Sequence, residues 1–226
     1  VSSCSPTVRA LHHARRPLPA APAPGRPLVV AMPSTPGQAP LDFAADEADV
    51  FEEYMGPATV LVAPERPPTR DGVLDLLPGS PVVHFACHGD NWDEDPSRHR
   101  LLLHDHAETP LTVEALASVR LDHARLAYLS ACGTAVSYDG LLADEAMHLT
   151  SAFQLCGYRH VIGTLWSVVD DTAAEVAEAF YAGLRSGTGT PDPDRSPYAL
   201  HAAVRELRAR LPRAPSLWAS HVHSGA

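Results

Sequence analysis

The chain contains no lysine, and all 17 of its basic residues are arginines. These arginines are scattered rather than gathered into one basic stripe, and 27 acidic residues outnumber them, which gives a formal net charge of -10. This charge balance disfavours a nucleic-acid partner, whose phosphate backbone needs a basic surface. The absence of lysine beside abundant alanine, proline and arginine is typical of a GC-rich genome, and we draw no chemistry from it.

Long apolar runs and a secretion signal are also missing. No apolar stretch approaches the roughly 20 residues that a membrane-spanning helix needs, and the N-terminus lacks a basic segment followed by an apolar one. The four cysteines, at positions 4, 87, 132 and 156, are too widely spaced for the disulfide framework of a small secreted domain. We therefore predict a cytoplasmic protein with no membrane partner.

The composition predicts one globular domain preceded by a tail. The chain has 226 residues, of which 45% are hydrophobic, and this is enough for one large α/β domain with a core of its own. Residues 1–27 are dense in proline and alanine, as a linker or tail would be, so we expect the domain to occupy residues 28–226. Since the chain starts at Val1 rather than methionine, we expect it to be a piece of a longer polypeptide.

Short apolar runs alternate with segments of helical periodicity throughout the domain. Strands are expected at 28–32, 59–63, 82–86, 126–131 and 160–166, edge elements at 101–105 and 217–226, and helices at 46–55, 69–77, 112–119, 144–157, 171–184 and 198–211. This alternation implies crossover connections between parallel strands. We therefore predict an α/β fold with a mostly parallel central sheet of about six strands and helices on both faces.

Two reactive side chains follow directly after predicted strands. His88 comes shortly after the strand at 82–86 and Cys132 directly after the strand at 126–131, and each is followed by a glycine. Reactive groups of open α/β sheets collect at the carboxyl ends of the strands. Because an imidazole can take the thiol proton or stabilise the thiolate, His88 and Cys132 form a candidate catalytic dyad for acyl transfer.

The glycine after His88 suits a second part of such a site. Gly89 has no Cβ to obstruct a substrate, and its N–H together with that of Cys132 could bind a developing oxyanion. Cys87 is a weaker candidate nucleophile, because successive side chains of a strand alternate between faces and Cys87 should point away from whatever His88 faces. We expect Cys87 and Cys156 to pack in the core.

A zinc site is the competing interpretation of the same region. Six potential ligands gather there, but their spacing matches no C-x-x-C pair or helical H-E-x-x-H template; they are His84, Cys87, His88, His99, His104 and His106. We predict that the protein needs no metal or organic cofactor.

Three segments in order resemble the CHAT domain, a branch of the caspase-like cysteine peptidases that is also similar to the protease core of separase. They are 84-HFACHG-89, 129-LSACGT-134 and 161-VIGTLWSVVDD-171. The resemblance extends from about Leu28 to the C-terminus, and a histidine some tens of residues before the cysteine is the order of caspase-type enzymes. It implies a caspase-haemoglobinase fold in which His88 is the general base or proton shuttle and Cys132 is the nucleophile.

The resemblance also implies a substrate class, and the chain differs from the family at two positions. Related proteases use an acidic residue near Asp170 and Asp171 to bind a basic P1 side chain, although an aspartate at the start of a helix also suits a capping role. Gly133 and Ala135 stand where the family commonly has an acidic residue and a second glycine. These two differences could alter the loop that shapes the substrate cleft.

These observations predict a cysteine endopeptidase that cleaves protein substrates. Family members are often fused to N-terminal repeats, so we expect an attached repeat or sensor domain to regulate the activity. The alternative is a catalytically latent or inactive scaffold of the same fold that serves in a signalling or defence assembly. Selective reaction of Cys132 with a thiol-directed peptidyl electrophile would distinguish the two.

Overall fold

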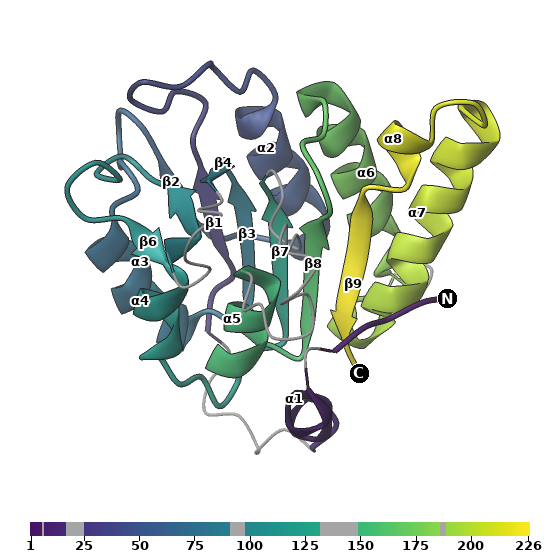
Figure 1. The fold of residues 1–226 in the computed structure, drawn as a ribbon, viewed down its shortest axis with the longest axis horizontal. Coiled ribbons are helices and arrows are strands. Elements are labelled where there is room, and N and C mark those ends of the chain that lie inside the picture. The colour runs from purple at the N-terminus through teal and green to yellow at the C-terminus, as the bar shows by residue number, and fades with distance from the viewer. Residues whose placement is uncertain (6, 17–24, 91–97, 132–148, 186–188) are drawn as a thin grey trace.

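A six-stranded sheet forms the centre of the molecule (Figure 1). The computed structural model describes residues 1–5, 7–16, 25–90, 98–131, 149–185 and 189–226. Neighbouring strands follow the order β2 (Thr59–Val62), β1 (Leu28–Ala31), β3 (Val82–Ala86), β7 (Leu126–Ser130), β8 (His160–Thr164) and β9 (His221–Gly225). All pairs are parallel except β8 with β9. The predicted α/β fold with a mostly parallel central sheet is therefore confirmed.

Helices cover both faces of this sheet. On one face lie α2 (Ala44–Met55), α6 (Asp170–Gly183) and α7 (Ser196–Arg210), and on the other lie α3 (Arg70–Leu76), α4 (Val113–Ala117) and α5 (Leu149–Cys156). Alternation along each strand divides the core, because Val29 packs with the first group of helices and Val30 with the second. The near-continuous apolar strands follow from this burial on both faces.

Local sequence signals explain where several helices begin and end. The Thr69 hydroxyl accepts the N–H of Gly72 at the start of α3, and the Thr112 hydroxyl accepts the N–H of Ala115 at the start of α4. Gly157 follows α5 with a φ of 134°, and a Cβ there would lie 2.0 Å from the carbonyl oxygen of Leu121. The predicted cap at Thr69 and the predicted end at Gly157 are both confirmed, and residues 144–148 of the helix expected at 144–157 lie outside the described residues.

Smaller elements complete the fold. A separate antiparallel sheet has the order β4 (His88–Asp90), β5 (Arg100–Leu102) and β6 (Leu111–Thr112), so the arm expected at 101–105 lies in the middle of a small sheet. The other elements within the described residues are α1 (Val8–Ala14), α8 (Pro215–Trp218) and two 3-10 turns at Leu77–Gly79 and Pro193–Arg195. None of the helices within the described residues is long and apolar enough to cross a bilayer.

Part of the N-terminal segment packs against the C-terminal strand. The N–H of Cys4 donates to the carbonyl of His223, and the N–H of Gly225 donates to the carbonyl of Cys4, which gives a parallel bridge at the edge of β9. Ala10 and Ala14 of α1 are buried. The domain boundary that we placed near residue 27 stays a prediction.

Buried histidines line the strands at this edge. His160 Nδ1 lies 3.0 Å from His223 Nε2, and His223 Nδ1 lies 2.7 Å from the hydroxyl of Ser3. Burial lowers the pKa of His221 to about 4, and burial together with the neighbouring His160 lowers the pKa of His223 to about 3. The folded protein therefore holds both imidazoles neutral at physiological pH.

We expect acid to destabilise the fold through these histidines. Below the ordinary histidine pKa of about 6.5, the unfolded chain takes up protons that the folded chain excludes, so the stabilisation is complete above this pH and is lost as the pH falls towards about 4 and then about 3. Between pH 7 and pH 5 the free energy of unfolding should fall by about 2 kcal/mol for each of His221 and His223. Urea unfolding across this range measures the effect.

The matched controls for this pH dependence are two substitutions to glutamine. His221→Gln removes one titrating group and should flatten the dependence, whereas His201→Gln changes an exposed imidazole and should leave it unchanged. An unaltered dependence in His221→Gln would contradict the assignment.

Candidate active site

The carboxyl ends of β3 and β7 lie side by side at one edge of the sheet. The two strands are parallel neighbours, with Val82 opposite Leu126 at one end and Ala86 opposite Ser130 at the other. Beyond this last pair, the N–H of Cys87 donates to the carbonyl of Ser130 over 3.3 Å. The register therefore brings the segments that lead to His88 and to Cys132 to the same level of the sheet.

Ala131 is the last described residue of the segment that leads to Cys132. Its carbonyl accepts the hydroxyl hydrogen of Thr164 over 2.7 Å, which ties the end of β7 to the end of β8. Cys132 itself lies outside the described residues. The meeting of its thiol with His88 therefore stays a prediction.

A backbone carbonyl fixes the orientation of His88. The side chain is half-buried at the start of β4, and its Nε2 lies 2.8 Å from the carbonyl oxygen of Ala39. Because a carbonyl only accepts hydrogen bonds, Nε2 must carry the proton. In the neutral ring Nδ1 then holds the lone pair, so this is the nitrogen that can act as a base.

Of the two predicted oxyanion donors, the structure describes Gly89. Gly89 is half-buried in β4, where it pairs with Leu101 of β5. The second donor, the N–H of Cys132, lies outside the described residues. The role of both N–H groups stays a prediction.

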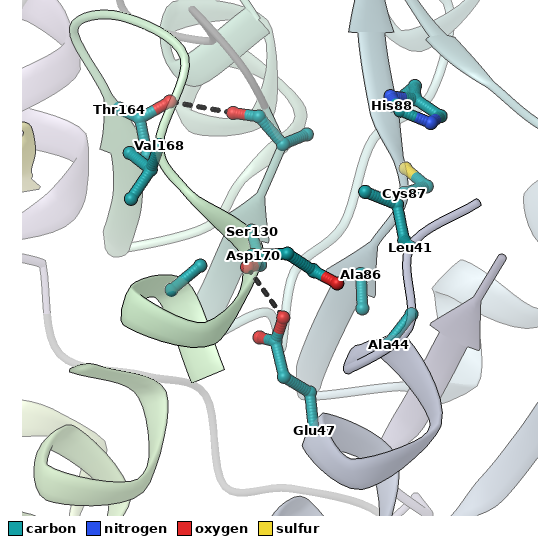
Figure 2. Close-up of a pocket in the computed structure, with 12 residues that line it drawn as sticks. Leu41, Ala44, Glu47, Ala86, Cys87, His88, Ser130, Thr164, Val168 and Asp170 are labelled. Atoms are coloured by element: carbon teal, nitrogen blue, oxygen red, sulfur yellow. Dashed lines mark hydrogen bonds between the residues drawn. The ribbon is translucent and has the colours of Figure 1, made fainter. Parts of the chain in front are cut away.

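A small pocket of about 30 Å³ lies at this edge of the sheet, and Figure 2 shows its lining. Its walls are mostly small apolar side chains, and its polar groups include His88 and two carboxylates, those of Glu47 and Asp170. The complete lining is Leu41, Ala44, Glu47, Ala86, Cys87, His88, Ser130, Ala131, Thr164, Val168, Asp170 and Ala173. The described residues thus place His88 beside a narrow, acidic recess.

The two aspartates at the start of α6 differ in position. Asp170 lines the pocket and its Oδ2 accepts the N–H of Phe43 over 2.9 Å, whereas Asp171 is exposed and its Oδ1 accepts the hydroxyl hydrogen of Thr172. The N-cap of α6 is Val169, and no side chain caps this end. The expectation that one aspartate caps α6 is therefore wrong, because Asp170 turns to the start of α2 instead.

The sequence pattern of the CHAT domain matches residues 2–226. The chain belongs to the CHAT domain family. No curated protein matches it by sequence. The predicted resemblance is therefore confirmed at the level of the family.

Solved structures place the CHAT domain among caspase-like folds. It is similar to the Arg-specific cysteine proteinase gingipain R (RgpB), with a TM-score of 0.62 and 11% identity over 96% of this chain and 50% of that one. A complex of the pro- and mature domains of Porphyromonas gingivalis RgpB has a TM-score of 0.62 and 12% identity over 96% of this chain and 51% of that one. The Saccharomyces cerevisiae separase–securin complex has a TM-score of 0.60 and 15% identity over 96% of this chain and 13% of that one. At these identities the likeness concerns the fold, and the chain spans about half the length of the gingipain chains it matches.

Sequence reasoning missed Glu47 as a residue of the site. Glu47 belongs to α2 and is 2% exposed, and its Oε1 accepts the hydroxyl hydrogen of Ser130 over 2.9 Å (Figure 2). The signal that could have revealed it is its spacing, since it shares the apolar face of the helix with Ala44, Ala48 and Phe51. A carboxylate on such a face needs a polar partner in the core.

Two of the described cysteines, Cys87 and Cys156, lie in the core as predicted. Cys87 is 1% exposed and belongs to the hydrophobic core, as predicted. It lines the same pocket as His88, however, so the expectation that it points away from the region that His88 faces is wrong. Cys156 is buried as well, and burial raises the pKa of its thiol to about 12. Cys4 is exposed at the N-terminal segment. Within the described residues no three His, Cys, Asp or Glu side chains are grouped so that they could hold a metal ion.

We expect Asp170 to stabilise the start of α2. Asp170→Ala leaves the N–H of Phe43 without its acceptor and should lower the free energy of unfolding by about 1 kcal/mol. Asp171→Ala is the matched control, because it removes an equal charge from the same helical turn but no contact with α2. Equal destabilisation by the two variants in urea unfolding would show that only the charge at the helix start matters.

Proposed function

We propose that this CHAT domain is a cysteine endopeptidase in which Cys132 is the nucleophile and His88 transfers the protons. The observation that carries the proposal is the parallel pairing of β3 with β7, because both segments that lead to the dyad end at one pocketed edge of the sheet. The caspase-like fold supports a peptidase, and the proton on His88 Nε2 leaves Nδ1 available as a base.

The proposed reaction is acyl transfer through a thioester. His88 Nδ1 takes the thiol proton of Cys132, and the sulfur forms a bond to the carbonyl carbon of the scissile peptide while the carbonyl electrons move to oxygen. The N–H groups of Gly89 and Cys132 stabilise that oxyanion. When the intermediate collapses, the C–N bond breaks and His88 returns the proton to the leaving amine. Water then hydrolyses the thioester by the same proton transfers.

The hydrogen bond to Ala39 suits this role. A general base must face the proton that it accepts, and a carbonyl that holds Nε2–H keeps the ring in one orientation and one tautomer. The same carbonyl stabilises the imidazolium that forms during the reaction, because the hydrogen bond becomes charge-assisted. A backbone group thus takes the part that a carboxylate takes in other catalytic triads.

Removing either member of the dyad should abolish cleavage and leave the fold intact. We expect Cys132→Ala and His88→Ala to lose at least about a thousandfold in kcat/KM, because each removes a group that acts in the transition state. Cys4→Ala is the matched control, since it removes an exposed thiol far from this pocket. Assays of a cleaved peptide, with circular dichroism to confirm folding, measure the effect, and full activity in Cys132→Ala would refute the mechanism.

The acidic recess favours a basic P1 residue. Asp170 lines the pocket beside the buried Glu47, and a guanidinium or ammonium group there would gain a charge-assisted hydrogen bond. Gingipain R is named as Arg specific, which agrees with this choice. Asp171 is exposed and is not among the described residues of the pocket, so Asp170 is the stronger candidate.

Asp170→Asn tests this preference without removing the contact to α2. The amide oxygen can still accept the N–H of Phe43, so the fold should be kept while the charge is lost. We expect kcat/KM for substrates with P1 Arg or Lys to fall about tenfold relative to substrates with a neutral P1. Asp171→Asn should leave this ratio unchanged. An unchanged ratio in Asp170→Asn would exclude Asp170 from P1 recognition.

In this proposal the protein acts in the cytoplasm, and an attached N-terminal repeat or sensor domain regulates its activity. A domain that stays latent without such a partner would keep its fold and still label slowly at Cys132. Labelling by a peptidyl electrophile that is selective for Cys132 over Cys4, Cys87 and Cys156 supports the peptidase. Absence of selective labelling, even in the full-length protein, supports the scaffold of a signalling or defence assembly.

A further inference from the structure

A buried carboxylate lies beneath the candidate site. Glu47 is 2% exposed and stands on the core-facing side of α2, where helical periodicity calls for an apolar residue. Glutamate is almost never fully buried unless it is paired. The contacts of Glu47 therefore indicate what this residue does.

Glu47 joins a chain of polar side chains that runs into the core. Its Oε1 accepts the hydroxyl hydrogen of Ser130, and its Oε2 lies 3.1 Å from His84 Nε2, a contact that is not aligned as a hydrogen bond. His84 Nδ1 in turn lies 2.7 Å from the hydroxyl of Tyr181, and the His84 ring stacks on Tyr128. If the Tyr181 hydroxyl donates to His84 Nδ1, the N–H of His84 is on Nε2 and faces the carboxylate of Glu47.

These contacts connect the two strands that lead to the dyad. His84 lies on β3, four residues before His88, and Ser130 lies on β7, two residues before Cys132. Because His84 pairs with Tyr128 in parallel strands, His84 and Ser130 project from the same face of the sheet, towards α2.

Glu47 also lies in α2, the helix that directly follows the segment that orients His88. The segment that leads into α2 contains Ala39, whose carbonyl holds His88 Nε2–H, and Phe43, whose N–H is held by Asp170. The Glu47 carboxylate thus contacts Ser130 of β7, as Figure 2 shows, and also His84 of β3, from the helix that follows the segment holding His88.

We propose that Glu47 is a positioning residue of the peptidase site, which holds α2 against β3 and β7 and so fixes the place of the segment that orients His88. The inference rests on the proposed function. It assigns Glu47 no contact with the substrate, so its loss should affect the chemical step rather than substrate binding.

Glu47→Gln tests the inference with little disturbance of shape. The amide oxygen can accept from Ser130, and the amide NH₂ can face His84 if that ring moves its proton to Nδ1 and donates to Tyr181. The variant should fold with a melting temperature near that of the wild type. We expect kcat to fall about ten- to a hundredfold with KM within about twofold, because small displacements of reacting groups have effects of this size.

Two further variants complete the experiment. Glu53→Gln makes the same change at an exposed position of the same helix and should leave kcat and KM unchanged. Ser130→Ala removes only the link between Glu47 and β7, so it should also lower kcat at nearly constant KM. Ser130→Ala carries the test alone if Glu47→Gln does not fold.

The outcomes separate this inference from the proposed function. Wild-type kcat in both Glu47→Gln and Ser130→Ala would overturn the positioning role while the peptidase stands. A raised KM at unchanged kcat would also overturn it, because Glu47 would then act on the substrate. If the wild-type protein neither cleaves peptides nor labels selectively at Cys132, the proposed function fails, and the positioning role fails with it.

Discussion

The parallel pairing of β3 with β7 is the constraint on which the site depends. Ala86 stands opposite Ser130, so the segments that lead to His88 and towards Cys132 leave their strands at one edge of the sheet. Both strands are buried on two faces by helices, so a one-residue slip in register would move each side chain into the opposite half of the core, where it would not fit. The core that stabilises the fold thus also fixes the level of the sheet at which β3 and β7 end.

The helix α2 and the segment before it act as a second support for the same edge. Along one short stretch of chain, the carbonyl of Ala39 orients His88, the N–H of Phe43 bonds to Asp170, and the carboxylate of Glu47 bonds to Ser130. Each contact joins this stretch to a different strand or helix of the site. A rigid scaffold with polar ties of this kind is what preorganised catalysis requires, because reacting groups must keep their separation without help from the substrate.

The strands, most helices and the family could be predicted from the sequence, because apolar periodicity and the three ordered motifs are local signals. The partners of the site residues could not. Asp170 bonds to a backbone group 127 residues away, and His88 bonds to a carbonyl, which any residue type provides. Sequence spacing placed Asp170 near a helix start, yet tertiary packing decided that it serves α2 rather than its own helix. Glu47 left a faint signal, an acid on an apolar face, whose meaning required the position of Ser130.

The pH dependence of Cys132 alkylation is the most direct test of the predicted pairing between thiol and imidazole. For a cysteine with no imidazole beside it, the alkylation rate plotted against pH has its inflection near the ordinary thiol pKa of about 8.5. If His88 stabilises the thiolate, the wild-type protein should show its inflection well below this value, and His88→Ala should return it to about 8.5. An inflection near 8.5 in both proteins would contradict the pairing and with it the peptidase mechanism.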